Sequence, residues 1–252
     1  CALLYGLSLN KWSALSAHLY SVFNFAVAWG KLQAEFSAGP TLTMPKLTHA
    51  KIHFNDQGTP VASDFDDVYF SNDGGMAETD YVFLQQNALP QRWQHHGERA
   101  FHIIETGFGT GANFLLTWLR FRQFRQAFPA AKCQRLYFSS VEKFPLSHAD
   151  LSRALAVHHE LGELCQLLLD AYPLCVPGCH RLSFDNGTVM LDLWFGDVNA
   201  LLPQHSAAAD AIYLDGFAPS KNPDMWQDSL FNNLARLSHT GCTVATFTAA
   251  GL

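Results

Sequence analysis

FHIIETGFGTGANF, residues 101–114, joins a short apolar run to an acid, three glycines at alternate positions and the start of a helical pattern. An apolar run of this kind predicts a buried strand, and the apolar spacing from Asn113 to Phe128, just before Pro129, predicts a helix. Glycines without a Cβ atom let backbone N–H groups come close to a bound molecule. The stretch therefore predicts a strand, a tight loop and a helix.

The same alternation continues along the chain. Further strands are predicted at residues 136–142, 189–197, 211–215 and 243–248, with a helical stretch at 147–171. Strands that alternate with helices are typical of a doubly wound, mostly parallel α/β sheet, which binds ligands at the carboxyl ends of its strands. The first four strands end on or near an acid, and we expect these acids at the functional edge: Glu105, Glu142, Asp197 and Asp215.

The segment before this alternation predicts a cap. Residues 46–81 are polar and rich in turn-forming residues, as in hairpins or loops. Residues 78–89 have helical spacing, with Tyr81, Leu84 and Ala88 on one face. We therefore expect a cap segment at 44–98 and a core at 99–252.

The first 43 residues are treated separately, because the chain begins at Cys1 and its first methionine is Met44. We expect residues 1–43 to be non-native or to lie upstream of the natural start. An amphipathic membrane anchor is the alternative. The apolar run in this part is too short and too interrupted to span a bilayer.

Composition predicts one globular enzyme domain without a general affinity for phosphate. The 252 residues are 48% hydrophobic and carry a formal net charge of −6, so a nucleic-acid partner would need a local basic patch. One cluster offers such a patch, with a solvated helix face as the alternative: Arg120, Arg122, Arg125, Lys132 and Arg135.

The six cysteines lack C-x-x-C spacing and fit reduced thiols in a cytoplasmic protein. We expect no metal. Cys175, Cys179 and His180 form only a weak metal pattern, and a loop around Pro177-Gly178 is the better interpretation.

The glycine loop alone leaves the ligand open. With Ala112 it also satisfies the dinucleotide pattern G-x-G-x-x-[GA], and a tight turn without a ligand is a further alternative. Glu105 favours an amino-acid ligand, because a carboxylate there would repel a pyrophosphate and attract an ammonium group. Glu142 is placed to accept both ribose hydroxyls. Asp197 could accept the exocyclic amine of adenine, with Phe144 or Phe195 stacking, although each acid alone could be a solvated strand end.

Asp215 lies in the stretch LDGFAP and would border the reaction centre. A carboxylate there can hold an incoming amine and accept a proton from it. A helix cap or turn former is the alternative for this residue.

Seven stretches together resemble one known family: FDDVYFSND (65–73), ETGFGTGANF (105–114), VEKFPL (141–146), PGCHRL (177–182), LDLWFGD (191–197), LDGFAPSKNPDMW (214–226) and ATFTAAG (245–251). In these stretches the sequence resembles the methyltransferase domain of the MnmC family, the bifunctional tRNA 5-methylaminomethyl-2-thiouridine biosynthesis proteins. The resemblance extends from Met44 to Leu252.

The resemblance implies a Rossmann-like class I S-adenosylmethionine-dependent methyltransferase fold, C-terminally truncated, with an N-terminal β/loop cap. It implies transfer of a methyl group to the 5-aminomethyl nitrogen of 2-thiouridine at the tRNA wobble position. The implied catalytic residue is Asp215. The implied cofactor-binding residues are Glu105, Gly107, Gly109, Gly111, Asn113, Glu142, Lys143 and Asp197. The implied substrate pocket holds Asp67, Tyr69, Phe217, Lys221 and Asn222.

Two departures from the family pattern matter. Ala112 stands where the family has a larger aliphatic residue, which should loosen packing slightly. The family's FAD-dependent oxidase domain removes a carboxymethyl group from the same nucleoside and has no counterpart in this sequence. We therefore expect neither FAD nor an oxidase step. We also expect the methyltransferase sheet to be open at one edge. The expected partner is tRNA, with no membrane. The alternatives are an NAD- or FAD-linked oxidoreductase and a non-catalytic cofactor-binding scaffold.

Overall fold

The computed structural model describes residues 47–71 and 75–247, which belong to one compact unit. The extension predicted at residues 1–43 lies outside these described residues. The central feature is a six-stranded sheet with the order β6-β7-β5-β4-β8-β9. Its strands are β4 (Ala100–Thr106), β5 (Arg135–Glu142), β6 (Gly178–Phe184), β7 (Val189–Phe195), β8 (Ala209–Leu214) and β9 (Ser238–Thr246).

Five of these strands run parallel, as the sequence predicts, and one runs antiparallel. The exception is β6, which pairs with β7 through a tight turn at Asp185–Gly187. The sequence analysis missed β6 and assigned its beginning to a loop. Most of its residues are half-buried or exposed at the edge of the sheet, so it lacks the continuous apolar run that revealed the central strands.

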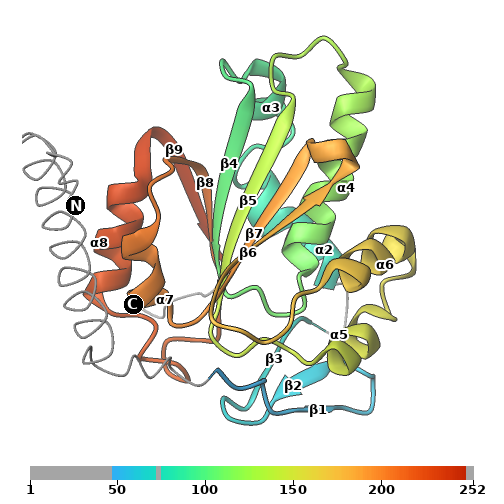
Figure 1. The fold of residues 1–252 in the computed structure, drawn as a ribbon, viewed down its shortest axis with the longest axis vertical. Coiled ribbons are helices and arrows are strands. Elements are labelled where there is room, and N and C mark those ends of the chain that lie inside the picture. Colours follow the sequence, from blue (N-terminus) through green and yellow to red (C-terminus); the bar gives the residue numbers. More distant parts are fainter. Residues whose placement is uncertain (1–46, 72–74, 248–252) are drawn as a thin grey trace, which may run out of the picture. The chain divides into compact units, whose positions relative to one another are not determined.

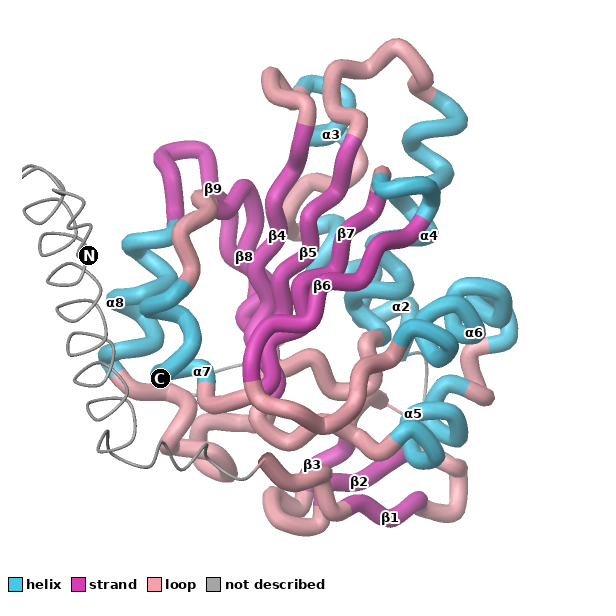
Figure 2. Tube along the Cα trace, viewed as in Figure 1, coloured by secondary structure: helices cyan, strands magenta, loops and turns pink. Residues whose placement is uncertain are grey.

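Helices cover both faces of the sheet (Figures 1 and 2). One face packs against α4 and α6, around a core that includes Phe114, Trp118 and Leu168. The other face packs against α7 and α8, around Ile212, Leu230 and related residues. The helices are α2 (Gly75–Thr79), α3 (Gln91–His95), α4 (Ala112–Ala127), α5 (His148–Leu155), α6 (Gly162–Ala171), α7 (Val198–Leu201) and α8 (Asp228–Leu237), with a π-helix at Asp80–Gln85 and short 3₁₀ turns at His159–Leu161, Asp185–Gly187 and Leu202–Gln204.

Two helical predictions need correction. The stretch predicted as helix at 147–171 is divided into α5 and α6, with a break before His159. In the stretch 78–89, Tyr81 and Ala88 are exposed and do not share the buried face of Leu84. The π-helix at Asp80–Gln85 explains the position of Tyr81, because its wider turn rotates the side chains away from the spacing of an α-helix. Ala88 lies beyond the π-helix, in a turn where its φ is 54°.

The predicted cap is a small antiparallel sheet made of β1 (Ile52–Phe54), β2 (Pro60–Ala62) and β3 (Asp67–Val68). It lies beside the carboxyl ends of the parallel strands, where Figure 1 shows it below β4 and β5. Its segment after Ala62 reaches the strand ends and contributes to the cavity described below. The cap therefore closes the edge at which a doubly wound sheet binds its ligands.

Asp185 joins the β6–β7 turn to α4. Its carboxylate accepts hydrogen bonds from the guanidinium group of Arg122 at 2.6 Å and 2.8 Å and from Trp118 Nε1 at 2.7 Å. Burial raises the pKa of Asp185, but these donors outweigh burial and hold the pKa below its ordinary value. The charged form of Asp185 therefore stabilises the fold.

We expect Asp185→Asn to lower the free energy of unfolding by about 1–2 kcal/mol at pH 7, because a neutral amide replaces a charged acceptor. Asparagine tolerates the positive φ of 48° at this position, so backbone strain does not obscure the result. A carboxylate with a lowered folded pKa stabilises above its unfolded pKa and loses this effect as the pH falls through the folded pKa. Urea unfolding at several pH values should show the difference disappearing in acid; a constant difference would contradict this account.

Candidate active site

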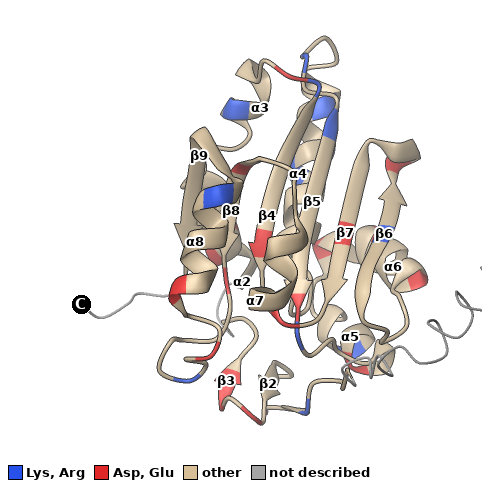
Figure 3. Ribbon diagram, turned by 60° about the vertical axis from the view of Figure 1, so that its left-hand side comes forward, with Lys and Arg blue, Asp and Glu red and all other residues tan. Residues whose placement is uncertain are grey.

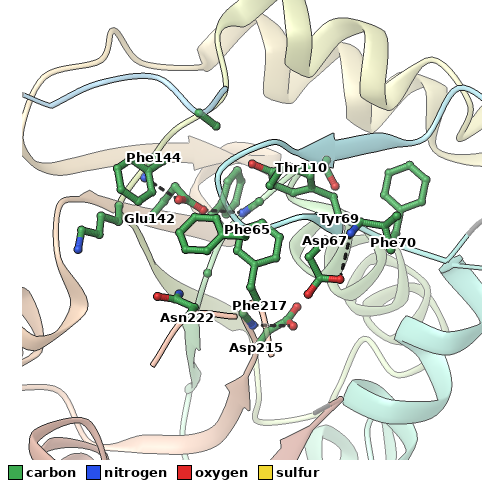
Figure 4. Close-up of a pocket in the computed structure, with 18 of the residues that line it drawn as sticks. Phe65, Asp67, Tyr69, Phe70, Thr110, Glu142, Phe144, Asp215, Phe217 and Asn222 are labelled. Atoms are coloured by element: carbon green, nitrogen blue, oxygen red, sulfur yellow. Dashed lines mark hydrogen bonds between the residues drawn. The ribbon is translucent and has the colours of Figure 1, made fainter. Parts of the chain in front are cut away.

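A cavity of about 790 Å³ opens at the carboxyl ends of the parallel strands. Its wall comes from the ends of the five parallel strands, from the cap, and from α2 and the π-helix that follows it. Figure 4 shows several of the side chains directed into the cavity. This volume is within the usual range for a small-molecule site. The predicted site residues that line it are Asp67, Tyr69, Gly107, Gly109, Asn113, Glu142, Lys143, Asp197, Asp215, Phe217 and Asn222.

The glycine loop forms one side of the cavity because its residues lack side chains. Gly107 has φ of 82°, and a Cβ atom there would lie 3.3 Å from both the carbonyl oxygen of Asp215 and the Cα atom of Gly216. Gly109 has φ of 54°, and a Cβ atom there would meet the Tyr69 ring at 3.1 Å. Larger residues would be strained at these φ values and would fill the space between the loop and the cap.

Glu142, the last residue of β5, is oriented by two backbone donors. Its Oε2 atom accepts a hydrogen bond from Gly109 N–H at 2.9 Å, and Oε1 accepts one from Phe144 N–H at 2.8 Å (Figure 4). Burial raises the pKa of Glu142, although these N–H groups favour the charged form. Each carboxylate oxygen can still accept another donor. Glu142 therefore has the geometry required to bind two hydroxyl groups.

Asp197 lies farther along the same edge, after β7. Its Oδ1 atom caps α7 by accepting a hydrogen bond from Asn199 N–H at 2.9 Å. Its Oδ2 atom lies 2.8 Å from Lys143 Nζ, so the two predicted cofactor residues form an ion pair in the cavity wall. Of the two predicted stacking residues, Phe144 lines the cavity, whereas Phe195 is completely buried in the core and cannot reach it.

Asp215 follows β8 and lines the cavity. Its Oδ2 atom accepts a hydrogen bond from Asn113 Nδ2 at 2.8 Å, and Oδ1 accepts one from Gly216 N–H at 2.8 Å. Burial raises the pKa of Asp215 to about 6, with a smaller contribution from the charge of Glu142, against the opposing effect of the two hydrogen bonds. Such a carboxyl group can accept a proton near neutral pH.

Three predicted site residues lie outside the cavity wall. Glu105 is completely buried behind Asn113. Gly111 begins α4 with φ of 75° and packs against the Phe108 ring. Lys221 extends toward the cap, where its Nζ atom contacts the carbonyl oxygen of Asp66 and lies 3.4 Å from Asp67 Oδ1.

An aromatic wall joins the cap to the loop after β8. The ring of Phe65 stacks on Phe217 with centroids 4.7 Å apart, and Tyr69 meets the same ring edge-on at 5.4 Å. Figure 4 shows Phe65, Phe217 and Asp215 close to one another in the cavity. Sequence reasoning named Tyr69 and Phe217 but missed Phe65. The signal for Phe65 was its position in the same matching stretch as Asp67 and Tyr69.

The basic cluster predicted from the sequence is largely engaged within the protein. Arg120 pairs with Asp80 at 3.0 Å, and Arg122 pairs with Asp185. Arg125 donates hydrogen bonds to backbone carbonyl groups near the end of α4. Figure 3 shows basic residues near the ends of α4 and β5 that are opposite the cap. The part of this cluster at the end of α4 and the start of β5 is therefore remote from the cavity, whereas Arg120 pairs with Asp80, which follows the cavity-lining Thr79.

Two other sequence expectations concern absences. Within residues 47–71 and 75–247, no helix is long and apolar enough to cross a membrane. The same part of the chain contains no group of three or more histidine, cysteine, aspartate or glutamate side chains arranged to hold a metal ion.

The chain is similar to known proteins over most of its length. It is 53% identical over 214 residues to the tRNA 5-methylaminomethyl-2-thiouridine biosynthesis bifunctional protein MnmC of Aliivibrio fischeri, which covers 83% of this chain and 32% of that protein. It is also 53% identical over 212 residues to the protein of the same name from Vibrio cholerae, covering 82% of this chain and 32% of the relative. The chain thus spans about a third of the length of these curated relatives.

The fold has a counterpart among solved structures. The crystal structure of MNMC2 from Aquifex aeolicus matches with a TM-score of 0.60 at 20% identity, covering 81% of this chain and 62% of that chain. A family model described as S-adenosyl-L-methionine-dependent methyltransferase matches residues 159–252. With the sheet order, the glycine loop and the acids at the strand ends, these similarities show that the chain belongs to the S-adenosyl-L-methionine-dependent methyltransferases and corresponds to the methyltransferase part of the MnmC proteins.

Proposed function

We propose that this protein transfers a methyl group from S-adenosylmethionine to the 5-aminomethyl nitrogen of 2-thiouridine at the wobble position of tRNA. The observation that carries the proposal is the single cavity in which the glycine loop, Glu142 and Asp215 meet. The names of the MnmC relatives support the nucleoside and tRNA as the substrate class. We propose a cytoplasmic site of action, where tRNA modification takes place.

The cavity is large enough for a small-molecule cofactor, and its acidic side chains suit the positive charge of S-adenosylmethionine. A Cβ atom on Gly109 would press against Tyr69, so glycine keeps open the space next to the loop where the methionine part would lie. Glu142 would accept the two ribose hydroxyls, and the side chain of Asp197 would lie at the adenine end. Phe144 is available there for stacking. When bound, the cofactor supplies a methyl group on positively charged sulfur.

Asp215 would act on the incoming amine. Its carboxylate can hold the amine by a charge-assisted hydrogen bond and accept the proton that the nitrogen gives up, leaving the lone pair free for the methyl carbon. The transfer is an in-line displacement, so alignment of nitrogen, carbon and sulfur is the main requirement. The hydrogen bonds from Asn113 and Gly216 hold the carboxylate in place for this task.

The aromatic wall suits a nucleobase. Protein sites that take a single base out of a nucleic acid often stack it on aromatic side chains, and Phe65, Tyr69 and Phe217 offer such faces beside Asp215. The base would thus approach the cofactor from the side of the cap. The same cavity gives no reason to favour a dinucleotide oxidoreductase, and the methyltransferase similarity speaks against that alternative.

We propose a route for tRNA that differs in one respect from the sequence expectation. Arg135 begins β5 and Glu142 ends it, so Arg135 lies roughly 20 Å from the cavity along that strand. Arg120 lies midway along α4 and is paired with Asp80. Lys51 and Lys143 line the cavity itself, and each is paired with an aspartate. We propose that these rim lysines contact phosphate near the modified base, while the remaining phosphate contacts come from elsewhere.

Glu142→Gln should weaken the binding of S-adenosylmethionine about 10- to 100-fold. A neutral amide loses charge-assisted hydrogen bonds to the ribose, and its NH₂ group must face either Gly109 N–H or Phe144 N–H. Isothermal titration measures the effect, with Glu163→Gln as a control at an exposed acid away from the cavity. Equal affinities for the wild type and Glu142→Gln would refute the ribose assignment. Titration with NADH in parallel tests the oxidoreductase alternative, because we expect no binding.

Asp215→Asn should reduce methyl transfer by about 10²- to 10⁴-fold while leaving the binding of S-adenosylmethionine nearly unchanged. In the wild type, kcat/KM should fall as the pH drops below about 6, because Asp215 accepts a proton only in its charged form and its pKa is raised to about 6. The assay follows labelled methyl into tRNA that carries 5-aminomethyl-2-thiouridine. A fully active Asp215→Asn variant would exclude the proposed base.

A further inference from the structure

Four side chains from separate parts of the chain form a continuous hydrogen-bonded path that leads from the cavity wall to the buried Glu105. Asn113 Nδ2 donates both to Glu105 Oε1 at 3.0 Å and to Asp215 Oδ2 at 2.8 Å. Asn113 Oδ1 accepts a hydrogen bond from the Thr79 hydroxyl at 3.1 Å. The amide group of Asn113 therefore has a partner for its oxygen and one for each N–H, and its orientation is determined by all three.

Glu105 occupies an environment that opposes a negative charge. It is completely buried, and its Oε2 atom lies 2.6 Å from Ser140 Oγ. Within the described part of the chain, the charged groups that act on Glu105 are the carboxylates of Asp215 and Glu142. Tyr213, on the adjacent strand β8, is its uncharged neighbour. Burial, reinforced by these acids, raises the pKa of Glu105 well above its ordinary value, against the opposing hydrogen bonds from Ser140 and Asn113.

We propose that Glu105 and Asn113 are positioning residues for the reaction: Glu105 holds the amide group of Asn113, and that amide group holds the carboxylate of Asp215 toward the cavity. Glu105 performs this role as an uncharged carboxyl group behind the wall. It is not a charged ligand for the ammonium group of the cofactor. The inference rests on the proposed function, because it assigns a purpose to the orientation of Asp215.

The charge state of Glu105 matters for Asp215. A second negative charge next to Asp215 would disfavour its ionised form and raise its pKa further, so that less of Asp215 could accept a proton near pH 7. A neutral Glu105 still accepts the N–H group of Asn113, so the path stays intact without this repulsion. Asn113 in turn donates to the ionised form of Asp215 and stabilises it.

Substitutions at Glu105 distinguish an uncharged positioning residue from a charged ligand of the cofactor. Glutamine has nearly the same shape as a protonated glutamic acid, and its Oε1 atom can accept from Asn113 while its NH₂ group reaches Ser140. Leucine fills similar space without an acceptor for Asn113. Glu105→Gln is therefore the matched control for Glu105→Leu, and circular dichroism verifies that both variants fold.

The first measurement uses the complete chain without a substrate. Carboxyl ¹³C NMR titration follows the protonation of Glu105 and Asp215. The variants Glu105→Gln and Asp215→Asn assign the two signals. We expect Glu105 to remain protonated at pH 7. We expect Asn113→Ala to raise the pKa of Asp215, because its donor is removed, and Glu105→Gln to leave that pKa nearly unchanged. A Glu105 signal that titrates near the ordinary value for glutamate would overturn the proposal.

The second measurement compares methyl transfer and cofactor binding. We expect Glu105→Leu and Asn113→Ala to lower kcat about 10- to 100-fold, with the acid limb of the Asn113→Ala pH profile moved to higher pH. We expect Glu105→Gln to rescue kcat to within about threefold, with a wild-type Kd for S-adenosylmethionine. A tenfold or greater loss of cofactor affinity in Glu105→Gln would instead identify a charged cofactor ligand. An inactive wild type would contradict the proposed function, whereas the NMR result would still decide the role of Glu105.

Discussion

The site depends on the central position of β4, which pairs in parallel with β5 on one side and β8 on the other. Parallel pairing brings the carboxyl ends of these strands to one edge, so Glu105, Glu142 and Asp215 become neighbours although they are distant in the chain. The loop after β4 must then cross the end of β8. Only a residue without a Cβ atom can do so at Gly107, where the backbone of Asp215 and Gly216 lies in close contact.

Acids gathered at one edge repel one another, and the structure offsets this repulsion mainly with neutral donors. Glu142 accepts two backbone N–H groups, and Asp215 accepts one backbone N–H and the amide of Asn113. A positive side chain, Lys143, pairs instead with Asp197 at the outer end of the cavity. The inner wall therefore remains negative. Such a wall suits a ligand that brings positive charge, as a sulfonium group and an amine both do.

The cap completes the site by supplying aromatic surface that the sheet lacks. Phe65 and Tyr69 pack against Phe217, which belongs to the loop after β8, and Lys221 of the same loop contacts the backbone of Asp66. These contacts connect the entrance of the cavity to the segment that carries Asp215. A base stacked at the entrance is thereby placed next to the carboxylate that acts on its amine.

Much of the fold follows from local patterns. The strand, glycine loop and helix at β4 and α4 are predictable because apolar spacing and glycine positions act within a few residues. The sequence alone therefore determined the parallel core, the functional edge and the acids along it.

The sequence did not reveal β6, which is a strand because it pairs with β7 and not because of its own pattern. The tertiary structure also decided the place of Glu105. A strand-end acid is expected to meet the ligand, but Asn113 of α4 and Ser140 of β5 hydrogen-bond to Glu105 inside the core. Burial and hydrogen bonding between distant segments arise only when the chain folds, so no local pattern contains them.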